Sequence, residues 1–313
     1  MKYTVNSKEV APCVIGTWAW GTGNNGAKMV FGKNNSEEQL QETFETAYEN
    51  GFNFWDTAEV YGMGTSEKLL GKLIKEKNNI VISTKHFPGK KYKTGENEKA
   101  IRKSLERLNI EYIDLYWLHS PKAIKENMKE LAECLKKGLI KNIGLSNCNI
   151  EQIKEANEIL KQNGTKLYAI QNHFSLLSIE REKEILEYCK NNSIIFFGYM
   201  ILEQGALSGH YDEKNHFPLL SMRGLTFGKS KFKKIKPLLQ YIKELGIKYD
   251  VDSSQIPIAW TISKGVFPII GLTKSNHAKS LKQGINIKLK KEEIEKLEQL
   301  AILSGVKCKG IWE

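Results

Sequence analysis

The segment FNFWD at 52–56, followed by a helical stretch at 66–76 and by IVISTK at 80–85, decides the fold class. Short runs of apolar, aromatic and β-branched residues are typical of strands, whereas apolar residues repeated on one face are typical of helices. A strand, a helix and a second strand in succession favour a unit in which the two strands run parallel. The segment therefore predicts a parallel sheet covered by helices.

The same alternation extends in both directions from this segment. The other strand-like runs are VIGT at 14–17, IDLYWLH at 113–119, IKNIGLS at 140–146, YAIQNH at 168–173, SIIFFGY at 193–199 and VFPIIGL at 266–272. The amphipathic stretches between the runs lie at 36–50, 97–108, 127–137, 150–163 and 181–191, with Ser36 as the N-cap of the first. Eight strand–helix units are the number that closes a TIM barrel. We predict an α/β fold of the (β/α)8 type, and a doubly wound sheet with a helical domain is the alternative.

No linker rich in Pro, Gly or Ser divides the chain, so residues 1–313 are predicted to form a single domain. The irregular segment 201–232 follows the seventh strand and leads to an extra helix at 233–245, and another extra helix is expected at 291–304. Long loops in compact domains are usually functional. Near the end of the chain, Trp312 either folds over the mouth of the barrel or frays.

Composition narrows the class of protein. Hydrophobic residues make up 41% of the chain, which is ample for a core. The first ten residues lack the apolar stretch of a signal peptide, and the longest apolar run, at 194–202, is about half a membrane span. The five cysteines are widely spaced, without a C-x-x-C pair. We expect a cytoplasmic protein that does not bind a membrane and leave its oligomeric state open.

The formal net charge of +11 comes mostly from lysines in short, scattered clusters. Aromatic residues that would stack on bases are not interleaved with them, so we predict a small-molecule partner rather than a nucleic acid. The segment GTGNNG at 21–26 has the G-x-G-x-x-G spelling of a dinucleotide-binding loop. That motif needs a helix starting on its last glycine, whereas the next helix is expected only at Ser36. We therefore interpret 21–26 as a plain loop.

Polar residues interrupt the apolar runs at one end of each strand, which is where barrel enzymes carry their chemistry. They are Asp56, Lys85, His119, Ser146, Asn147, Gln171, Asn172, Thr273, Lys274 and Ser275. A buried charge is costly unless it is paired, and Asp56 beside Lys85 on the next strand would satisfy this need. Each residue taken singly could be a satisfied core residue; their shared position at one end of consecutive strands favours a site.

Tyr61 lies five residues after Asp56 and adds a possible acid and base to these polar residues. A nearby ammonium favours the phenolate, so Lys85 is expected to lower the pKa of Tyr61 and to make it an acid and base. His119 would donate a hydrogen bond to a carbonyl oxygen. This arrangement suits carbonyl reduction and needs no metal; no metal-ligand spacing is present.

Several stretches resemble the aldo-keto reductase family, in the order in which that family has them. They are GFNFWDTAEVYGMGTSEKLLG, VISTKH, DLYWLHSP, IGLSN and AIQNHFSLL, and the resemblance runs from about Val14 to Glu298. It implies a TIM barrel that binds NADP(H) without a Rossmann loop and reduces a small-molecule carbonyl substrate. It also implies that the loop 21–26 borders the substrate pocket.

The resemblance also implies roles for individual residues. The catalytic tetrad would be Asp56, Tyr61, Lys85 and His119. The cofactor would be held by Thr17, Asp56, Ser146, Asn147, Gln171, Tyr199, Met200, Leu202, Gly271, Thr273, Lys274 and Ser275. In that set Tyr199 would stack on the nicotinamide, although a core aromatic is the alternative, and Lys274 would lie at the 2′-phosphate. An arginine that the family usually has beyond Lys274 is not evident, and His277 or Lys279 would replace it.

The substrate pocket is expected to draw on Trp18, Trp20, Phe87 and the segment 201–232, which suggests apolar or aromatic carbonyls. Trp117 could be pocket floor or barrel core, whereas Trp55 should pack under helices because it alternates with Asp56. Two other functions stay open. The chain could be a non-catalytic regulatory or binding subunit of the same fold, or an aldolase that forms a Schiff base at Lys85, which the charge of Asp56 would oppose.

Overall fold

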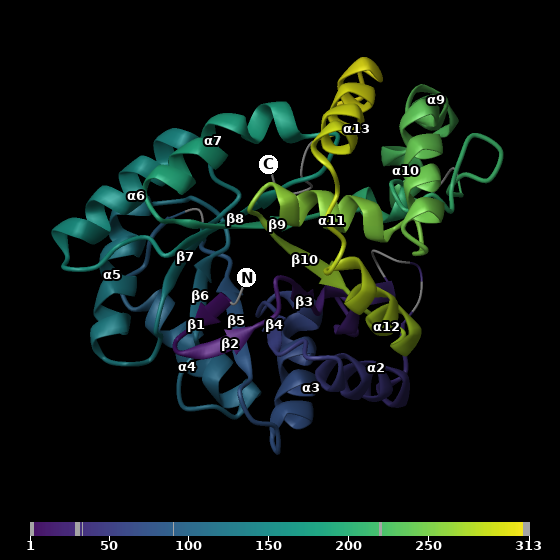
Figure 1. The fold of residues 1–313 in the computed structure, drawn as a ribbon. Helices are drawn as coiled ribbons and strands as arrows, with labels where there is room; N and C mark the ends of the chain where they lie inside the picture. Colours follow the sequence, from purple (N-terminus) through teal and green to yellow (C-terminus); the bar gives the residue numbers. More distant parts are fainter. Residues whose placement is uncertain (1–2, 29–31, 33, 90, 219–220, 309–313) are drawn as a thin grey trace.

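Eight parallel strands close into a barrel in the order β10-β3-β4-β5-β6-β7-β8-β9, as the alternation predicts (Figure 1). The computed structural model describes residues 3–28, 32, 34–89, 91–218 and 221–308, so Trp312 lies outside the described residues. The barrel strands are β3 (Val14–Gly16), β4 (Phe54–Asp56), β5 (Val81–His86), β6 (Leu115–Leu118), β7 (Ile143–Ser146), β8 (Ala169–His173), β9 (Ile195–Tyr199) and β10 (Phe267–Gly271). All eight lie within or one residue beyond the predicted runs, so the single TIM-barrel prediction is confirmed.

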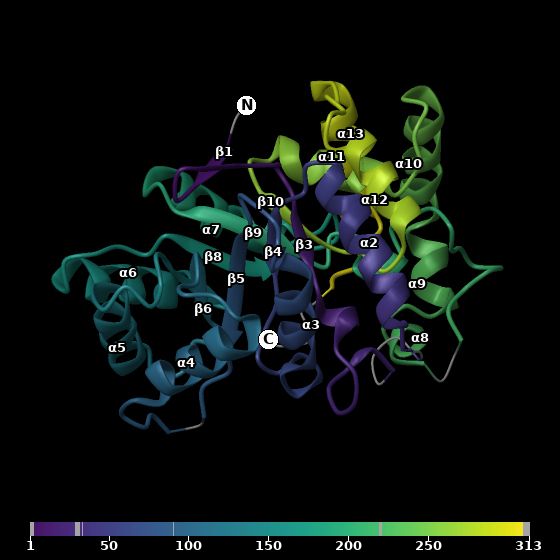
Figure 2. The same ribbon diagram turned by 90° about the horizontal axis from the view of Figure 1, so that it is seen from below.

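The helices cover the outside of the barrel, as Figure 2 shows from a second direction. Those that follow successive strands are α2 (Glu37–Glu49), α3 (Thr65–Ile74), α4 (Glu96–Leu108), α5 (Ile124–Lys136), α6 (Ile150–Gln162), α7 (Ile179–Asn191), α11 (Gln255–Ser263) and α12 (Ser275–Gly284). Ser36 is the N-cap of α2, and its hydroxyl accepts a hydrogen bond of 3.2 Å from the Gln39 amide. Such a cap satisfies one of the donors that a helix start leaves unpaired.

Extra helices follow the seventh and eighth barrel strands, as expected. The first group comprises α8 (Met222–Thr226), α9 (Lys229–Lys234) and α10 (Lys236–Lys248), and α13 (Lys291–Leu303) follows α12. The predicted helix at 233–245 is therefore two helices, with a break at Ile235. Figure 1 shows α9, α10 and α13 at one side of the barrel, away from α4, α5 and α6.

An antiparallel hairpin that the sequence did not predict closes one end of the barrel. It consists of β1 (Tyr3–Val5) and β2 (Lys8–Val10). Val5 and Val10 pack into the same apolar cluster as Val14 and Phe54, at the amino-terminal ends of the strands. Lys8 Nζ lies 3.0 Å from Asp114 Oδ1 and fastens the hairpin to the barrel. Access to the barrel interior is thereby left to the carboxyl-terminal end.

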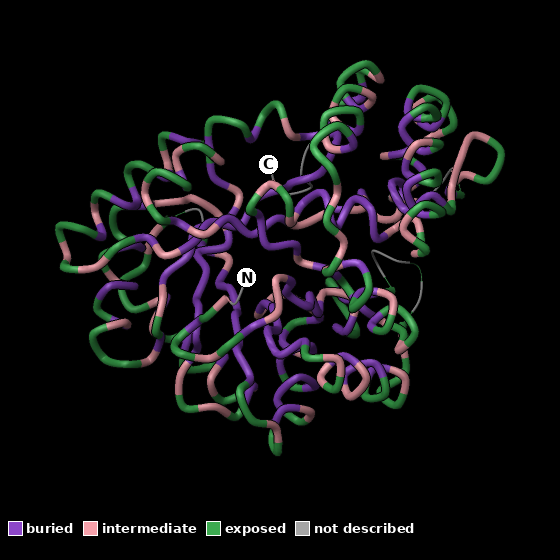
Figure 3. The backbone as a smooth tube through the Cα atoms, viewed as in Figure 1, coloured by how far each residue is buried: buried purple, intermediate pink, exposed green. Residues whose placement is uncertain are grey.

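Two apolar cores follow from the alternation along each strand. Inward-pointing residues fill the barrel, among them Leu115, Trp117 and Phe197. Outward-pointing residues such as Trp55 pack against the helices. Trp55 contacts Phe44 of α2, with ring centroids 4.6 Å apart, as expected. In Figure 3 the barrel strands are mostly buried, while the outer helices alternate between buried and exposed residues. Within the described residues, no helix has both the length and the apolarity to cross a membrane.

Candidate active site

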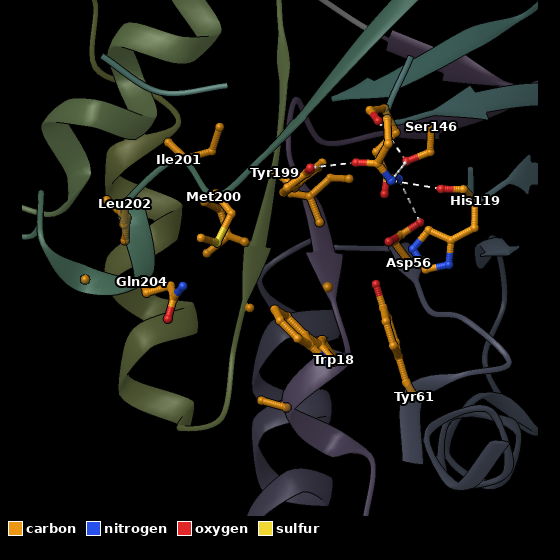
Figure 4. A pocket seen from close by; sticks show the side chains of 18 of the residues that line it. Trp18, Asp56, Tyr61, His119, Ser146, Tyr199, Met200, Ile201, Leu202 and Gln204 are labelled. Atoms are coloured by element: carbon orange, nitrogen blue, oxygen red, sulfur yellow. Dashed lines mark hydrogen bonds between the residues drawn. The ribbon is translucent and has the colours of Figure 1, made fainter. Parts of the chain in front are cut away.

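A cavity of about 290 Å³ opens at the carboxyl-terminal end of the barrel strands (Figure 4). The predicted residues that line it are Trp18, Asp56, Tyr61, His119, Ser146, Asn147, Gln171, Tyr199, Met200, Leu202 and Gly271. They come from many strands and their following loops, and the closed barrel brings them to one place. Their convergence is what the strand-end pattern predicts.

Asp56 and Lys85 form a buried ion pair beneath the cavity. Lys85 is fully buried, and its Nζ donates to Asp56 Oδ2 and, over 2.7 Å, to the Thr57 carbonyl oxygen. The other carboxylate oxygen of Asp56 accepts from Ser83 Oγ at 2.6 Å and from Trp117 Nε1 at 3.1 Å. A buried carboxylate with this many donors is held in one orientation. Trp117 is thus barrel core that supports the site, and not pocket floor.

Gly144 makes room for Trp117. A Cβ atom at Gly144 would lie 2.1 Å from the Trp117 ring, which no real side chain could tolerate. The glycine on β7 therefore allows the indole on β6 to lie flat in the barrel and reach Asp56. This is one place where a strand glycine has a specific packing reason.

Tyr61 begins a 3-10 turn, Tyr61–Gly64, which is the first element after β4. Its phenol oxygen lies 3.4 Å from Lys85 Nζ, and its ring stacks on Trp18 with centroids 6.1 Å apart. In Figure 4 the phenol oxygen points toward Asp56 and His119. The ring centroids of Tyr61 and His119 are 6.3 Å apart. The structure therefore brings the four predicted tetrad side chains together.

The loop 21–26 packs against the turn that carries Tyr61. A Cβ at Gly62 would lie 2.2 Å from Thr65 Oγ1 and 2.6 Å from Thr22 N, so only glycine fits there. The Gly62 amide donates to the Asn25 carbonyl oxygen over 3.2 Å. None of the described residues of 21–26 lines the cavity, so the expectation that this loop borders the pocket is wrong; it supports Tyr61 from behind.

The expected direction of the Tyr61 pKa shift is also wrong. Burial raises the pKa of the phenol, Lys85 lowers it only in part, and Asp56 raises it further, so the net pKa lies above the ordinary 10.0. The sequence identified the cation but not the depth of burial, which disfavours the phenolate more strongly. Tyr61 is consequently a protonated phenol at neutral pH.

Lys85 and His119 have shifts in opposite directions. Burial alone would lower the pKa of Lys85, but the charges and hydrogen bonds of Asp56 and Tyr61 raise it above its ordinary value. Burial, together with the charges of Lys85 and His86, holds the pKa of His119 well below its usual range. The site thus contains a charged ammonium, a neutral imidazole and a neutral phenol side by side.

A row of amide and hydroxyl groups forms the wall of the cavity opposite Tyr61. Asn147 Nδ2 donates to the His119 carbonyl oxygen over 2.8 Å, and Tyr199 Oη donates to Asn147 Oδ1 over 2.7 Å. Ser146 Oγ donates to the Gln171 carbonyl oxygen over 2.8 Å, and Gln171 Nε2 lies 3.3 Å from Asp56 Oδ1. These bonds hold the donors and acceptors in place before any ligand arrives.

Some predicted site residues lie elsewhere. Trp20 is buried at 1% exposure, donates to the Leu272 carbonyl oxygen and packs on Trp55, so its assignment to the substrate pocket is wrong. The Thr17 hydroxyl donates to the Asp56 carbonyl oxygen below the cavity. Phe87 is outside the cavity wall but contacts the His119 ring, with centroids 5.5 Å apart.

Thr273, Lys274 and Ser275 lie at the start of α12, beyond the cavity. Lys274 is exposed, and Ser275 Oγ donates to Glu42 Oε1 over 2.7 Å. Helix starts bind anions because their first amides are unpaired. A carboxylate at this point is unfavourable for an anion, so Glu42 would repel an anion that Lys274 attracts.

Cavity residues that the sequence did not single out one by one come from two barrel strands, the turn after β3 and the segment 201–232. They are Gly16, Ala19, Ile201, Gln204, Gly205, Arg223, Ile269 and Ile270. Arg223 donates to the Gln204 carbonyl oxygen over 3.2 Å and lies over the Phe217 ring at 4.5 Å. Arg223 and Gln204 belong to the segment 201–232, and no periodic pattern in its sequence predicts where these side chains lie. The expectation that this segment contributes to the cavity is nevertheless supported by Gln204, Gly205 and Arg223.

Comparison with known proteins gives consistent results. The model of the Aldo/keto reductase family matches residues 12–302. The chain is 33% identical to chloroplastic pyridoxal reductase of Arabidopsis thaliana, over 96% of this chain and 86% of that protein. It is 28% identical to an NADP(+) aldo-keto reductase of Schizosaccharomyces pombe, over 90% and 87% of the two chains.

Solved structures share the fold at lower identity. Glycerol dehydrogenase from Gluconobacter oxydans superposes with a TM-score of 0.83 at 24% identity, covering 99% of this chain and 98% of that one. An aldo/keto reductase from Klebsiella pneumoniae, solved with NADP and acetate, has a TM-score of 0.73 at 21% identity, covering 100% and 99%. These likenesses establish the barrel architecture independently of the sequence pattern.

Proposed function

The chain belongs to the aldo/keto reductase family, and we propose that it uses NADPH to reduce an aldehyde or a ketone to an alcohol. The cofactor, when bound, supplies a hydride to the carbonyl carbon. The observation that carries the proposal is the 3.4 Å contact of the Tyr61 phenol with Lys85, in a cavity that His119 also lines. This contact supports the proposal that a proton donor, a cation and a hydrogen-bond donor act at one point.

Tyr61 is the proposed proton donor to the carbonyl oxygen. Burial keeps the pKa of its phenol above the ordinary value, so the proton is present at neutral pH. As the proton leaves, the adjacent Lys85 ammonium stabilises the phenolate that forms, because opposite charges attract strongly away from water. Asp56 keeps Lys85 charged and fixed. Asp56 and Lys85 would therefore keep the Tyr61 side chain in place both as the phenol and as the phenolate.

His119 is proposed to orient the substrate. Its low pKa makes it a neutral imidazole, which still carries one ring N–H. A neutral donor can bind a carbonyl oxygen without competing with Tyr61 as the acid. Trp18 lines the cavity beside Tyr61, and Phe87 packs on the His119 ring from outside the cavity wall, so an apolar or aromatic group beside the carbonyl would be favoured.

The residues around the cavity fit a nicotinamide cofactor. Ser146, Asn147 and Gln171 offer amide and hydroxyl groups for a carboxamide, and Tyr199 offers an aromatic face beside them. The backbone at Met200, Leu202 and Gly271 lines the cavity further along. Thr273, Lys274 and Ser275 would hold the 2′-phosphate. Thr17 would contribute indirectly, because its hydroxyl donates to the Asp56 carbonyl oxygen below the cavity.

Replacing Lys274 by alanine should weaken the binding of NADPH more than that of NADH. A lysine at a phosphate contributes a charge-assisted contact, so we expect the Kd of NADPH to rise about tenfold and that of NADH by less than about twofold. Fluorescence titration measures both values. Lys282→Ala, with the same charge change in the last turn of α12, is the control. Equal losses for the two cofactors in Lys274→Ala would contradict the phosphate assignment.

The pH dependence of reduction should follow the raised pKa of Tyr61. Reduction needs the protonated phenol, so kcat/KM is expected to stay level from neutral pH to about 10, the ordinary pKa of tyrosine, and to fall only above it. Alcohol oxidation needs the phenolate and should rise over the same range. Initial rates in both directions measure these profiles. A fall in reduction between about pH 7 and pH 9 would mean that Lys85 overcomes burial and lowers the pKa after all.

The experiment that tests the function is NADPH oxidation against a panel of aldehydes, ketones and sugars. Aromatic aldehydes should be the better substrates, and pyridoxal belongs in the panel because the Arabidopsis relative is named for it. Absence of NADPH oxidation with every class of carbonyl would contradict the proposal. The cytoplasmic location remains a prediction.

Neither alternative function gains support from the site. A Schiff base at Lys85 requires a neutral amine, whereas the raised pKa of Lys85 keeps it charged. A purely regulatory subunit would not need Asp56, Tyr61, Lys85 and His119 together around one cavity.

A further inference from the structure

The turn that follows β9 lines the cavity in an unfavourable backbone conformation. Met200, Glu203 and Gln204 have φ angles of 61°, 46° and 55°, in the left-handed region that residues with a Cβ rarely adopt. Met200, Gln204 and neighbouring Leu202 all face the cavity (Figure 4). Such backbone persists only where surrounding contacts impose it. Some contact must therefore hold the turn 200–205 in this shape.

The Glu203 carboxylate supplies that contact. It is 2% exposed, and its Oε1 lies 2.7 Å from His173 Nε2 and accepts a hydrogen bond from Ser175 Oγ. Glu203 is thus tied to the end of β8 and to the residue that follows Phe174, while its backbone forms part of the strained turn.

The tautomer of His173 follows from its contact with Arg181. Arg181 Nη2 lies 3.4 Å from His173 Nδ1, and a guanidinium can only donate. Nδ1 is therefore the acceptor, the ring proton is on Nε2, and Nε2–H donates to Glu203. The chain Arg181, His173, Glu203 has one consistent direction of hydrogen bonds, which ends at the buried Glu203 carboxylate.

His173 also supports the other end of the same segment. It is the register partner of Tyr199, and the two rings stack with centroids 5.9 Å apart and planes inclined by 28°. One buried imidazole consequently contacts Tyr199 through its ring and Glu203 through its N–H. The residues between them, 200–202, carry the cavity-facing backbone.

We propose that Glu203, held by His173, is the positioning residue of the cofactor site. It fixes Tyr199 and the turn 200–205 in the shape that NADPH meets, so that binding does not have to order the turn. This inference rests on the proposed function, because it takes the cavity wall at 199–205 to be a cofactor contact. Glu203 itself touches no substrate or cofactor in this proposal.

Replacing Glu203 by alanine should weaken NADPH binding while sparing the chemical step. If the free turn holds the competent shape about a tenth of the time, the Kd of NADPH rises about tenfold. Turnover at saturating NADPH should fall by less than about threefold, because Tyr61 and Lys85 are untouched. Hydrogen exchange of the amides at 205–207 should accelerate in the cofactor-free protein. Glu203→Gln, which keeps an acceptor for His173 and Ser175, should restore the Kd to within about threefold of the wild type.

Glu293→Ala controls for the general loss of a buried carboxylate. Glu293 is 3% exposed and bonded to Tyr249 Oη at 2.6 Å, on α13, and it does not line the cavity. Equal Kd values in Glu203→Ala and Glu293→Ala would overturn the inference, since a merely structural role lowers Tm alone. If Glu203→Ala does not fold, His173→Asn removes the same tie and is judged in the same way. A wild-type protein that fails to bind NADPH would instead contradict the proposed function.

Discussion

Replacing Tyr61 by phenylalanine is expected to lower kcat for carbonyl reduction by about 100-fold or more, the usual contribution of a positioned acid. The change removes one oxygen, which lies 3.4 Å from Lys85 Nζ, and leaves the ring stacked on Trp18. NADPH binding depends on other walls of the cavity, so its Kd should change by less than about twofold. Steady-state rates and fluorescence titration separate the two effects.

Tyr116→Phe is the matched control for this prediction. Tyr116 is a fully buried tyrosine on β6 that points away from the cavity, and its phenol has no hydrogen-bond partner among the described residues. Turnover of this variant should remain at the wild-type level. Tyr61→Phe retaining more than about a tenth of wild-type turnover would show that another group donates the proton.

Separating Asp56 from Lys85 should destabilise the protein more than any other single polar change. Either Asp56→Asn or Lys85→Met leaves a buried charge without its partner, at a cost of about 3–5 kcal/mol in the free energy of unfolding. The double variant contains neither charge, so its loss should be well below the sum of the two single losses. Urea unfolding, with slopes compared across the variants, measures each value.

The exposed pair at α2 and α3 provides the contrast. Lys72 and Glu37 are both exposed, so Lys72→Met should cost less than about 1 kcal/mol. Strict additivity of Asp56→Asn and Lys85→Met would mean that water reaches the pair and that the charges act independently. That result would also weaken the account of why Lys85 stays charged.

Sequence pattern predicted the barrel well because each barrel strand is an apolar run flanked by polar helices. It failed where the pattern is absent. The helix α11 has buried residues on all sides, including Trp260, so it shows no amphipathic stripe. Each strand of the hairpin buries a single apolar residue, Val5 or Val10, after a half-buried and an exposed one, so neither strand forms an apolar run.

The site was predictable where residues stand at strand ends and not where tertiary packing decides. Asp56, Lys85 and His119 follow directly from strand position, and Tyr61 from its distance to Asp56. Trp20 was misplaced because a 3-10 turn at Trp18–Trp20 follows the first barrel strand and turns its indole into the core. The sign of the Tyr61 pKa shift depends on how deeply the phenol is buried, which the order of residues does not reveal.

The two ends of the described chain belong to opposite ends of the barrel. The hairpin at Tyr3–Val10 covers the closed floor, whereas the Cys308 amide donates to the Leu177 carbonyl oxygen in the segment after β8, at the open end. A purification tag or an immobilising surface attached at the amino terminus would therefore act on the sealed base and leave the cavity facing solution. The same attachment at the carboxyl terminus would act on the end of the barrel that carries the cavity, and would disturb the site it was meant to present.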